Sequence, residues 1–279
     1  MTTLHVRHST SFAYSRPVHA SYNETRLRPA ALAGQRVLES SLEVTPLSWH
    51  GEYRDYWGTR VDMLEVITPH ESLTVVADAR VERDDAPQRV VGCDWSALRA
   101  PALEDRMSEL LMPTATTAPD PTLVELAHEQ ARGLDVHQAA TAVCDGLRDQ
   151  MGYVHGVTGV HTRAAEAWQT RKGVCQDIAH LAVGALRSLG IPARYVSGYL
   201  HPLAGAEPGR PAVGQSHAWV EFWSGEWFGY DPTNGIEVGP NHVVVARGRE
   251  YGDVTPLRGV YSGGGAASQR VEVLITIVG

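Results

Sequence analysis

The spacing of apolar residues changes along this chain, from every second residue to helical spacing, and the change divides it into two parts. In the first 85 residues, apolar and polar side chains alternate in several runs, the pattern of half-buried β-strands. The clearest run places five apolar or small residues on one face: Leu73, Val75, Ala77, Ala79 and Val81. Prolines and glycines separate the runs, so residues 1–85 are predicted to form a β-rich unit, an antiparallel sandwich or barrel-like sheet.

Residues 86–101 lack a clear period and are predicted to be a linker, which leaves residues 102–279 as the second unit. Helical spacing prevails after the linker, and both Asp120-Pro121 and Asp135 are suited to begin helices. The tail, residues 270–278, alternates again and predicts a final strand. The predicted fold class is therefore α+β, with the β-rich unit packed as a layer on a core of helices and antiparallel strands.

The composition excludes several classes of function. The 279 residues carry a net charge of −8, and 43% of them are hydrophobic, as in an ordinary globular protein. A general nucleic-acid binder needs a basic face, so we expect no nucleic-acid partner. No run of about 20 apolar residues is present, so we expect no membrane partner. The N-terminus lacks a signal-peptide pattern and three cysteines do not suggest a disulfide framework, so the expected location is the cytoplasm.

The most informative segment is a helical pattern that begins at Cys175 and ends before Gly190. This places Cys175 in the first turn, where unpaired backbone N–H groups favour a thiolate over a thiol. The neighbouring Asp177 mildly opposes that effect because a carboxylate repels a thiolate, although it also suits the helix dipole. Most single cysteines are inert core residues, so the position of Cys175 does not by itself establish a nucleophile.

Two alternating runs on either side of a turn at Ser224-Gly225 predict a β-hairpin. If its loop spans residues 223–225, the constant sum of paired residue numbers sets His217 directly opposite Asp231. Opposed side chains on one face have Cβ atoms roughly 5 Å apart, within hydrogen-bonding reach of an imidazole and a carboxylate. A two-residue loop would shift the register by one, so the prediction depends on the loop length.

These three residues together suit nucleophilic catalysis. Cys175 is the candidate nucleophile, His217 exchanges its proton, and Asp231 fixes the imidazole tautomer. The backbone N–H of Cys175 is a natural donor to an oxyanion, and Gln176 is a candidate second donor by adjacency. Trp219 shares the His217 face of its strand and is a candidate wall of the site, although a strand aromatic more often serves packing.

The other histidines are weaker signals. His155 and His161 flank a glycine-containing turn and are expected to line the cleft. A zinc site formed by Cys175, His180 and His217 is an alternative, but no CxxC or HExxH spacing supports it, so no metal is predicted.

The segments around these residues resemble the bacterial transglutaminase-like superfamily, a branch of papain-like thiol enzymes. Four blocks carry the resemblance in order: GVCQDIAHL, LGIPARYVSGYL, SHAWVEF and DPTN. Further likeness lies in SYNETRLRP, GQRVL and residues 53–58 near the N-terminus, and in GREYGDVTPLRGVYSGGG near the C-terminus. The resemblance therefore covers nearly the whole chain and implies a papain-like transglutaminase core with its accompanying β-rich N-terminal region.

The resemblance also implies a chemistry. The catalytic residues of the family correspond to Cys175, His217 and Asp231, and by analogy Trp168 is a further candidate oxyanion donor. Family members form a thioester from a carboxamide or peptide carbonyl and pass the acyl group to an amine or to water. This chemistry needs no metal and no cofactor.

Three functions follow as hypotheses. The first is a cysteine-dependent peptidase or amidohydrolase acting on an amide, peptide or acyl substrate. The second is a transamidase or acyltransferase, in which the same thioester passes to an amine acceptor. The third is a noncatalytic binding module, which the presence of all three site residues disfavours. No motif specifies the oligomeric state.

Overall fold

The structure is a computed structural model that describes residues 1–202 and 207–279. Its strands are β1 Thr2–Thr25, β2 Gln35–Thr45, β3 Trp49–Arg54, β4 Arg60–Val66, β5 His70–Arg83, β6 Gly152–Tyr153, β7 Lys172–Gly173, β8 Ala193–Leu200, β9 Ala212–Val213, β10 Gln215–Trp223, β11 Trp227–Asp231, β12 Ile236–Glu237, β13 His242–Gly248, β14 Leu257–Gly263 and β15 Ala267–Ile277. Its helices are α1 Trp95–Leu98, α2 Pro101–Leu111, α3 Pro121–Gln130, α4 Val136–Gln150, α5 Ala164–Thr170, α6 Cys175–Ser188 and α7 Tyr251–Val254. Within the described residues, no helix is long and apolar enough to cross a membrane.

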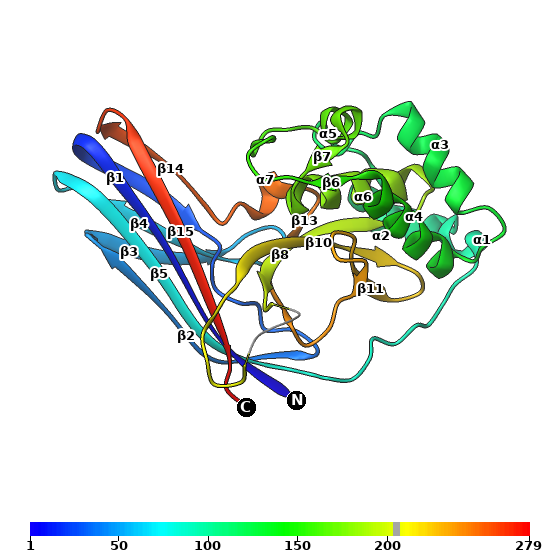
Figure 1. Ribbon diagram of the computed structural model, residues 1–279, viewed down its shortest axis with the longest axis horizontal. Coiled ribbons are helices and arrows are strands. Elements are labelled where there is room, and N and C mark those ends of the chain that lie inside the picture. The colour runs from blue at the N-terminus through cyan, green and yellow to red at the C-terminus, as the bar shows by residue number, and fades with distance from the viewer. Residues whose placement is uncertain (203–206) are drawn as a thin grey trace.

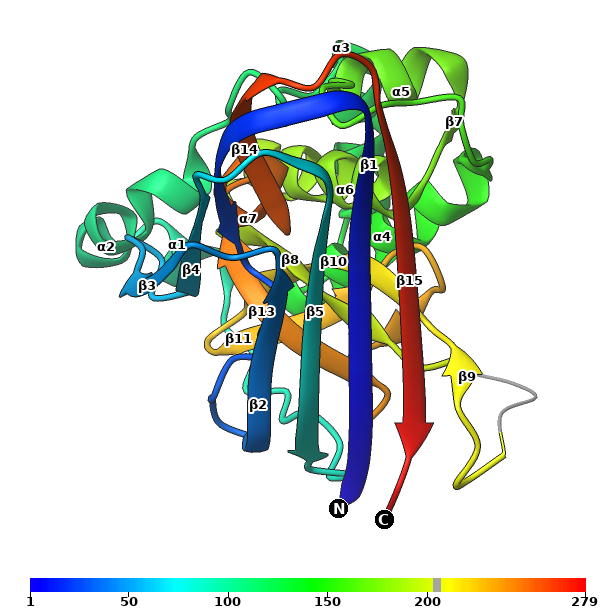
Figure 2. The same ribbon diagram turned by 90° about the vertical axis from the view of Figure 1, so that its left-hand side faces the viewer.

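The N-terminal unit is one curved antiparallel sheet, which confirms the predicted β-rich unit (Figure 1). Five strands lie side by side in the order β2-β5-β1-β15-β9 (Figure 2). The long strand β1 pairs with β5 and β15 along its first half and with β4 and β14 beyond Val18. The pairing of β1 with β5 shifts register between Ala13 and Val18, where an irregularity of this kind bends a sheet.

The alternation in β5 has the predicted consequence for burial. The five apolar or small residues of its stripe are all buried: Leu73, Val75, Ala77, Ala79 and Val81. Ala79 and Val81, together with Leu4 and Val6 of β1, belong to the large core. The same core contains buried residues of α4, α6, β8 and β10. The N-terminal sheet is therefore the packing layer of the second unit.

The C-terminal strands belong to this same sheet. The predicted final strand exists as β15, but it pairs with β1 from Leu4 to Tyr14, and β14 pairs with the second half of β1. The sequence-based division placed these strands within residues 102–279, whereas their hydrogen bonds are made to the N-terminal unit. An alternating pattern identifies a strand without identifying the strand beside it, which explains the difference.

The second unit is built on a five-stranded antiparallel sheet in the order β12-β11-β10-β8-β13. Helices α2 to α6 gather on one side of it (Figure 1). The predicted caps of α3 and α4 are present, with Asp120 accepting a hydrogen bond from the Thr122 N–H and Asp135 from the Gln138 N–H. The buried helix predicted from Cys175 is α6, and all of its residues from Asp177 to Arg187 are buried.

Gly198 lies on β8, an interior strand of this sheet, between β10 and β13. A Cβ atom there would lie 2.1 Å from the Val243 carbonyl oxygen and 2.5 Å from the Trp219 ring. We expect Gly198→Ala to lower the free energy of unfolding by about 3 kcal/mol, because neither the strand backbone nor the buried ring can move away.

Chemical denaturation of the purified variant measures this effect. Gly159→Ala is the matched control, because a Cβ atom there has no heavy atom within 4 Å. An equal change in the two variants would contradict the packing argument.

Candidate active site

Cys175 is the first residue of α6, following the extended residue Val174, as the sequence predicted. It is half-buried and lines a groove of about 680 Å³. One wall of the groove comes from α6 and β10, and the other includes residues 270–273 of β15. The C-terminal strand of the chain therefore borders the space in front of the thiol.

Asp177 forms its hydrogen bonds at the N-terminus of α6 and not with the thiol. Its Oδ2 accepts hydrogen bonds from the Val174 N–H at 2.8 Å and from the Thr158 hydroxyl at 2.7 Å. Burial raises the pKa of Asp177, while the bond from the Val174 backbone opposes the rise. The absence of a side chain at Gly173 is required here, since a Cβ atom would lie 2.7 Å from the Asp177 side chain.

The hairpin that carries His217 and Asp231 forms, but its register differs from the prediction. Trp223 pairs with Trp227 and Val220 with Tyr230, so the loop spans residues 224–226 instead of 223–225. The shift equals two residues and therefore keeps every side chain on its predicted face. His217 and Asp231 are diagonal neighbours, and the His217 Nε2 lies 2.8 Å from the Asp231 Oδ2.

His217 is the link between the carboxylate and the thiol. It is buried, and burial lowers its pKa, but the hydrogen bond to Asp231 and the proximity of Cys175 outweigh this and raise its pKa to about 10. Because Nε2 is bound to Asp231, Nδ1 is the nitrogen left for the thiol, and it has no hydrogen-bond partner in residues 1–202 and 207–279. An imidazole and the positive end of a helix are the two kinds of group that make a cysteine a nucleophile in thiol enzymes.

Asp231 is fully buried and accepts several hydrogen bonds. Its Oδ2 receives bonds from His217, from the Asn234 side chain at 2.7 Å and from His242 at 3.2 Å, and its Oδ1 receives the Thr233 N–H at 3.0 Å. Burial favours the neutral carboxyl, but the bonds from His217 and His242 lower the pKa of Asp231. The group is therefore an ionised carboxylate that holds His217 in one orientation.

Tyr153 lies near Cys175 in the groove. Burial, and next the proximity of Cys175, raise the pKa of its phenol to about 12. Tyr153 and Cys175 both line the groove. The Tyr153 side chain is 41% exposed, so a substrate can displace it.

The three predicted supporting residues lie in different places. Gln176 lines the groove, and its Nε2 lies 3.3 Å from the Val160 carbonyl oxygen. Trp168 is buried and donates its indole N–H to Thr122 at 2.8 Å, so this N–H is not available to an oxyanion. Trp219 is fully buried behind His217, with ring centroids 6.2 Å apart, and is not among the residues that line the groove.

The remaining histidines do not assemble a metal site around the thiol. His180 is buried and its Nε2 accepts the Tyr251 N–H at 3.0 Å, so this nitrogen is already engaged. His155 lines the groove as predicted, whereas His161 is exposed and lies outside the groove lining. Among the described residues, the group that could hold a metal ion is His50, Glu52 and Asp62, in the N-terminal unit.

His242 was missed by the sequence analysis. It begins β13, is buried, and receives the Gly239 N–H on its Nδ1 at 3.3 Å. That acceptor role leaves the proton on Nε2, which donates to Asp231. Burial lowers the pKa of His242, so the ring is a neutral donor. The valine run that follows it predicts a strand, but nothing in the sequence pairs that strand with the site.

We expect His242→Ala to lower kcat about tenfold with little change in KM, because Asp231 loses one of the donors that hold it. His242→Gln should recover most of the loss, since its amide N–H can still reach the carboxylate. Steady-state kinetics of both variants, with melting temperatures to verify folding, measure the effect. If the glutamine variant is as impaired as the alanine variant, the positioning role is wrong.

Comparison with known proteins places the chain in a family. Residues 4–82 match the bacterial transglutaminase-like N-terminal region, and residues 124–232 match the transglutaminase-like superfamily. An uncharacterized protein of Mycobacterium leprae is 41% identical over 276 residues, covering 99% of both chains. A protein-glutamine gamma-glutamyltransferase of Pseudomonas aeruginosa is 38% identical over 80 residues, which cover 27% of this chain and 12% of that protein.

The fold is shared with a solved structure. A Cytophaga hutchinsonii protein described as a "putative cysteine protease" superposes with a TM-score of 0.76 at 22% identity, over 100% of this chain and 91% of that one. The second matched region includes Cys175, His217 and Asp231. The chain thus belongs to the transglutaminase-like superfamily, with the N-terminal region of its bacterial members.

Proposed function

We propose that this protein is a cysteine acyl-enzyme that cleaves amide or peptide bonds through a thioester on Cys175. The observation that carries the proposal is the alignment of three groups: a groove-lining thiol at a helix N-terminus, an imidazole beside it, and a buried carboxylate that holds the imidazole. The second product of the reaction is the free amine of the substrate.

In the acylation step, the Cys175 sulfur attacks the carbonyl carbon and the carbonyl electrons move to oxygen. His217 then gives its Nδ1 proton to the leaving nitrogen as the carbon–nitrogen bond breaks, which leaves a thioester. Asp231 accepts the other imidazole N–H throughout, so the ring presents the correct nitrogen to the reacting atoms. The Cys175 N–H would stabilise the oxyanion.

In the deacylation step, His217 removes a proton from water, which attacks the thioester carbon. The tetrahedral intermediate collapses, the sulfur leaves, and a carboxylic acid is released. A water molecule has thus supplied a hydroxyl to the acyl group and a proton to the amine, and the enzyme returns to its first state.

Transamidation is the second candidate. It uses the same thioester, with an amine replacing water as the acceptor. The similarity of an 80-residue segment to a protein-glutamine gamma-glutamyltransferase favours this candidate. The two reactions differ in the second step only, so the same three residues are required for both.

Intact-mass measurement after exposure to a mixed amide and peptide library tests the proposal. We expect a single acyl adduct that maps to Cys175, and its mass would identify the donor. Burial raises the pKa of both other thiols, Cys93 and Cys144, so neither should compete. Cys93→Ala is the matched control and should retain the adduct, whereas an adduct that persists on Cys175→Ala would reject the proposal.

Adding an amine to the identified donor separates the two candidates. A hydrolase should yield mainly the free acid, and a transamidase mainly the amine conjugate. The ratio of conjugate to acid, measured by mass spectrometry as the amine concentration rises, decides between them.

A further inference from the structure

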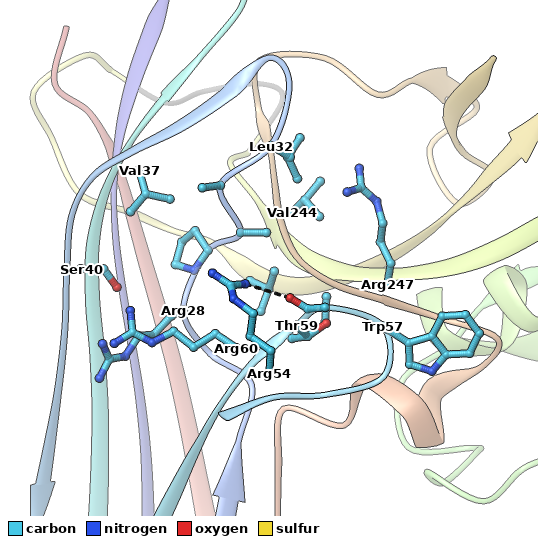
Figure 3. Close-up of a pocket in the computed structure, with 16 residues that line it drawn as sticks. Arg28, Leu32, Val37, Ser40, Arg54, Trp57, Thr59, Arg60, Val244 and Arg247 are labelled. Carbon is cyan, nitrogen blue, oxygen red and sulfur yellow. Dashed lines mark hydrogen bonds between the residues drawn. The ribbon is translucent and has the colours of Figure 1, made fainter. Parts of the chain in front are cut away.

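A second pocket lies where the N-terminal unit meets β13 (Figure 3). Its volume is about 230 Å³, and it is bordered by the segment after β1, by β2, by the β3–β4 turn and by residues 244–247 of β13. It shares no lining residue with the groove of Cys175. The pocket is thus a separate feature of the fold.

The lining of this pocket is strongly basic. It contains four arginines, Arg28, Arg54, Arg60 and Arg247, and no aspartate or glutamate. The side chains of Arg28, Arg54 and Arg60 gather on one side of the pocket, and Arg247 lies on the other side of Val244 (Figure 3). Arg247 is already paired with Glu221, at 2.8 Å for each of two hydrogen bonds. The three gathered guanidinium groups therefore define the site.

Their positive charge is only partly balanced. The Arg28 Nη2 lies 2.9 Å from Asp62, and the Arg60 Nη2 lies 2.6 Å from Glu52. Arg54 donates to the Gly58 carbonyl at 3.0 Å and has no carboxylate partner in the described part of the chain. Three cations thus face two carboxylates, which leaves one positive charge beside the pocket.

Several polar atoms of the cluster also lack a partner. The Nε atoms of Arg28 and Arg60 and the Oγ of Ser40, another lining residue, are buried without a hydrogen bond to any residue that the structure describes. Arg28 as a whole is only 8% exposed. Buried donors are seldom left unpaired, so three such atoms around one pocket indicate a missing acceptor.

The occupant that fits is an anion and not a cation. His50, Glu52 and Asp62 lie near this cluster and could in principle hold a metal ion. Their carboxylates are already bound by Arg28 and Arg60, and His50 is bound to Asp62 at 2.9 Å. A metal ion would have to displace these cations, whereas an oxyanion would add the negative charge that the cluster lacks.

We propose that this pocket binds an oxyanion, the phosphate or carboxylate group of a small molecule. Guanidinium groups match both groups because their N–H donors form a planar fork that binds two oxygens at once. Arg28, Arg54 and Arg60 supply the charge, and the Ser40 hydroxyl supplies a neutral donor. The bound group would connect the N-terminal unit to β13.

Isothermal titration with inorganic phosphate and, separately, with acetate tests the proposal, at an ionic strength held constant with chloride. We expect saturable binding to one site by at least one of the two probes, and the tighter probe identifies the preferred group. Thermal melts should show a parallel rise in melting temperature with the concentration of that probe.

The matched variants are Arg54→Gln and Arg89→Gln. Both residues are exposed, and neither forms an ion pair with a carboxylate in residues 1–202 and 207–279, but only Arg54 lines the pocket. We expect Arg54→Gln to weaken binding at least about tenfold and Arg89→Gln to leave it unchanged. Ser40→Ala should weaken binding severalfold without loss of folding.

Two outcomes would overturn the proposal. One is the absence of saturable binding of both phosphate and acetate to the wild-type protein. The other is binding that Arg54→Gln and Arg89→Gln weaken equally, since that result would reflect the net charge of the protein and not this pocket.

Discussion

Replacing Cys175 with alanine is expected to lower turnover by at least about 10⁴-fold, because the covalent intermediate can no longer form. The sulfur lies in the groove near His217. Burial raises the pKa of the other two thiols, so neither is expected to act as the nucleophile. The substrate for the assay is the donor identified by its mass on the wild-type enzyme. Initial rates of acid or conjugate formation then give the loss directly.

Asp231→Asn is expected to lower turnover less than Cys175→Ala does. The asparagine keeps the size of the side chain but removes the negative charge that stabilises the imidazolium, so we expect a loss of about 10²- to 10⁴-fold. Cys93→Ala is the control for removal of a thiol and should keep the wild-type rate. Activity above about 1% in Cys175→Ala, with melting temperature unchanged, would show that another group carries the reaction.

When the pH is lowered, the protein is expected to unfold before the pH reaches about 4, because two buried histidines resist protonation. His8 is 2% exposed and His180 is 0% exposed. Burial lowers the pKa of His8 to about 4 and that of His180 to about 3, from about 6.5 in the unfolded chain. These differences correspond to about 3 kcal/mol for His8 and about 5 kcal/mol for His180, comparable with the whole stability of a domain.

The direction of the effect follows from proton binding. Below about pH 6.5 the unfolded chain takes up a proton at each of these positions and the folded chain does not, so the free energy of unfolding falls as the pH falls. For His180 the geometric cause is clear, since Nε2 already accepts the Tyr251 N–H at 3.0 Å. A proton on that nitrogen would make it a second hydrogen-bond donor facing the Tyr251 N–H, with no acceptor between them. His217 has a raised pKa, so its contribution is fully present in acid and is lost only at alkaline pH.

Denaturation at several pH values between 4.5 and 6 measures the slope of stability against pH. His180→Gln should reduce that slope by about one proton, or about 1.4 kcal/mol per pH unit, whatever its effect on stability at neutral pH. His161→Gln, in which the replaced ring is exposed, is the matched control and should keep the wild-type slope. A slope unchanged by His180→Gln would exclude this ring as a source of acid sensitivity.

The hairpin shows why part of the site was predictable. The predicted pairing of β10 with β11 was displaced by two residues, because the loop uses residues 224–226. Side chains in a strand alternate with a period of two, so the error left His217 and Asp231 on one face and still within hydrogen-bonding distance. An error of one residue would have separated them.

The surroundings of Asp231 were not predictable in the same way. His242 reaches the carboxylate because β13 lies beside β8, although β8 and β13 are separated in sequence by β9 to β12. Trp168 was expected near the oxyanion, but its N–H is taken up by Thr122 of another helix. Both results depend on packing between distant segments, for which the sequence contains no local signal.

The sequence by itself determined the local features: the strands of the β-rich unit, the capped helices, the position of Cys175 at a helix start, and the shared face of His217 and Asp231. Each depends on a period or a cap within a few residues. Only the tertiary structure decided that β15 pairs with β1 and borders the groove, that His242 supports Asp231, and that Arg28, Arg54 and Arg60 surround a second pocket. The physical reason is that pairing and packing between segments far apart in the chain depend on the energy of the whole core, which no single segment specifies.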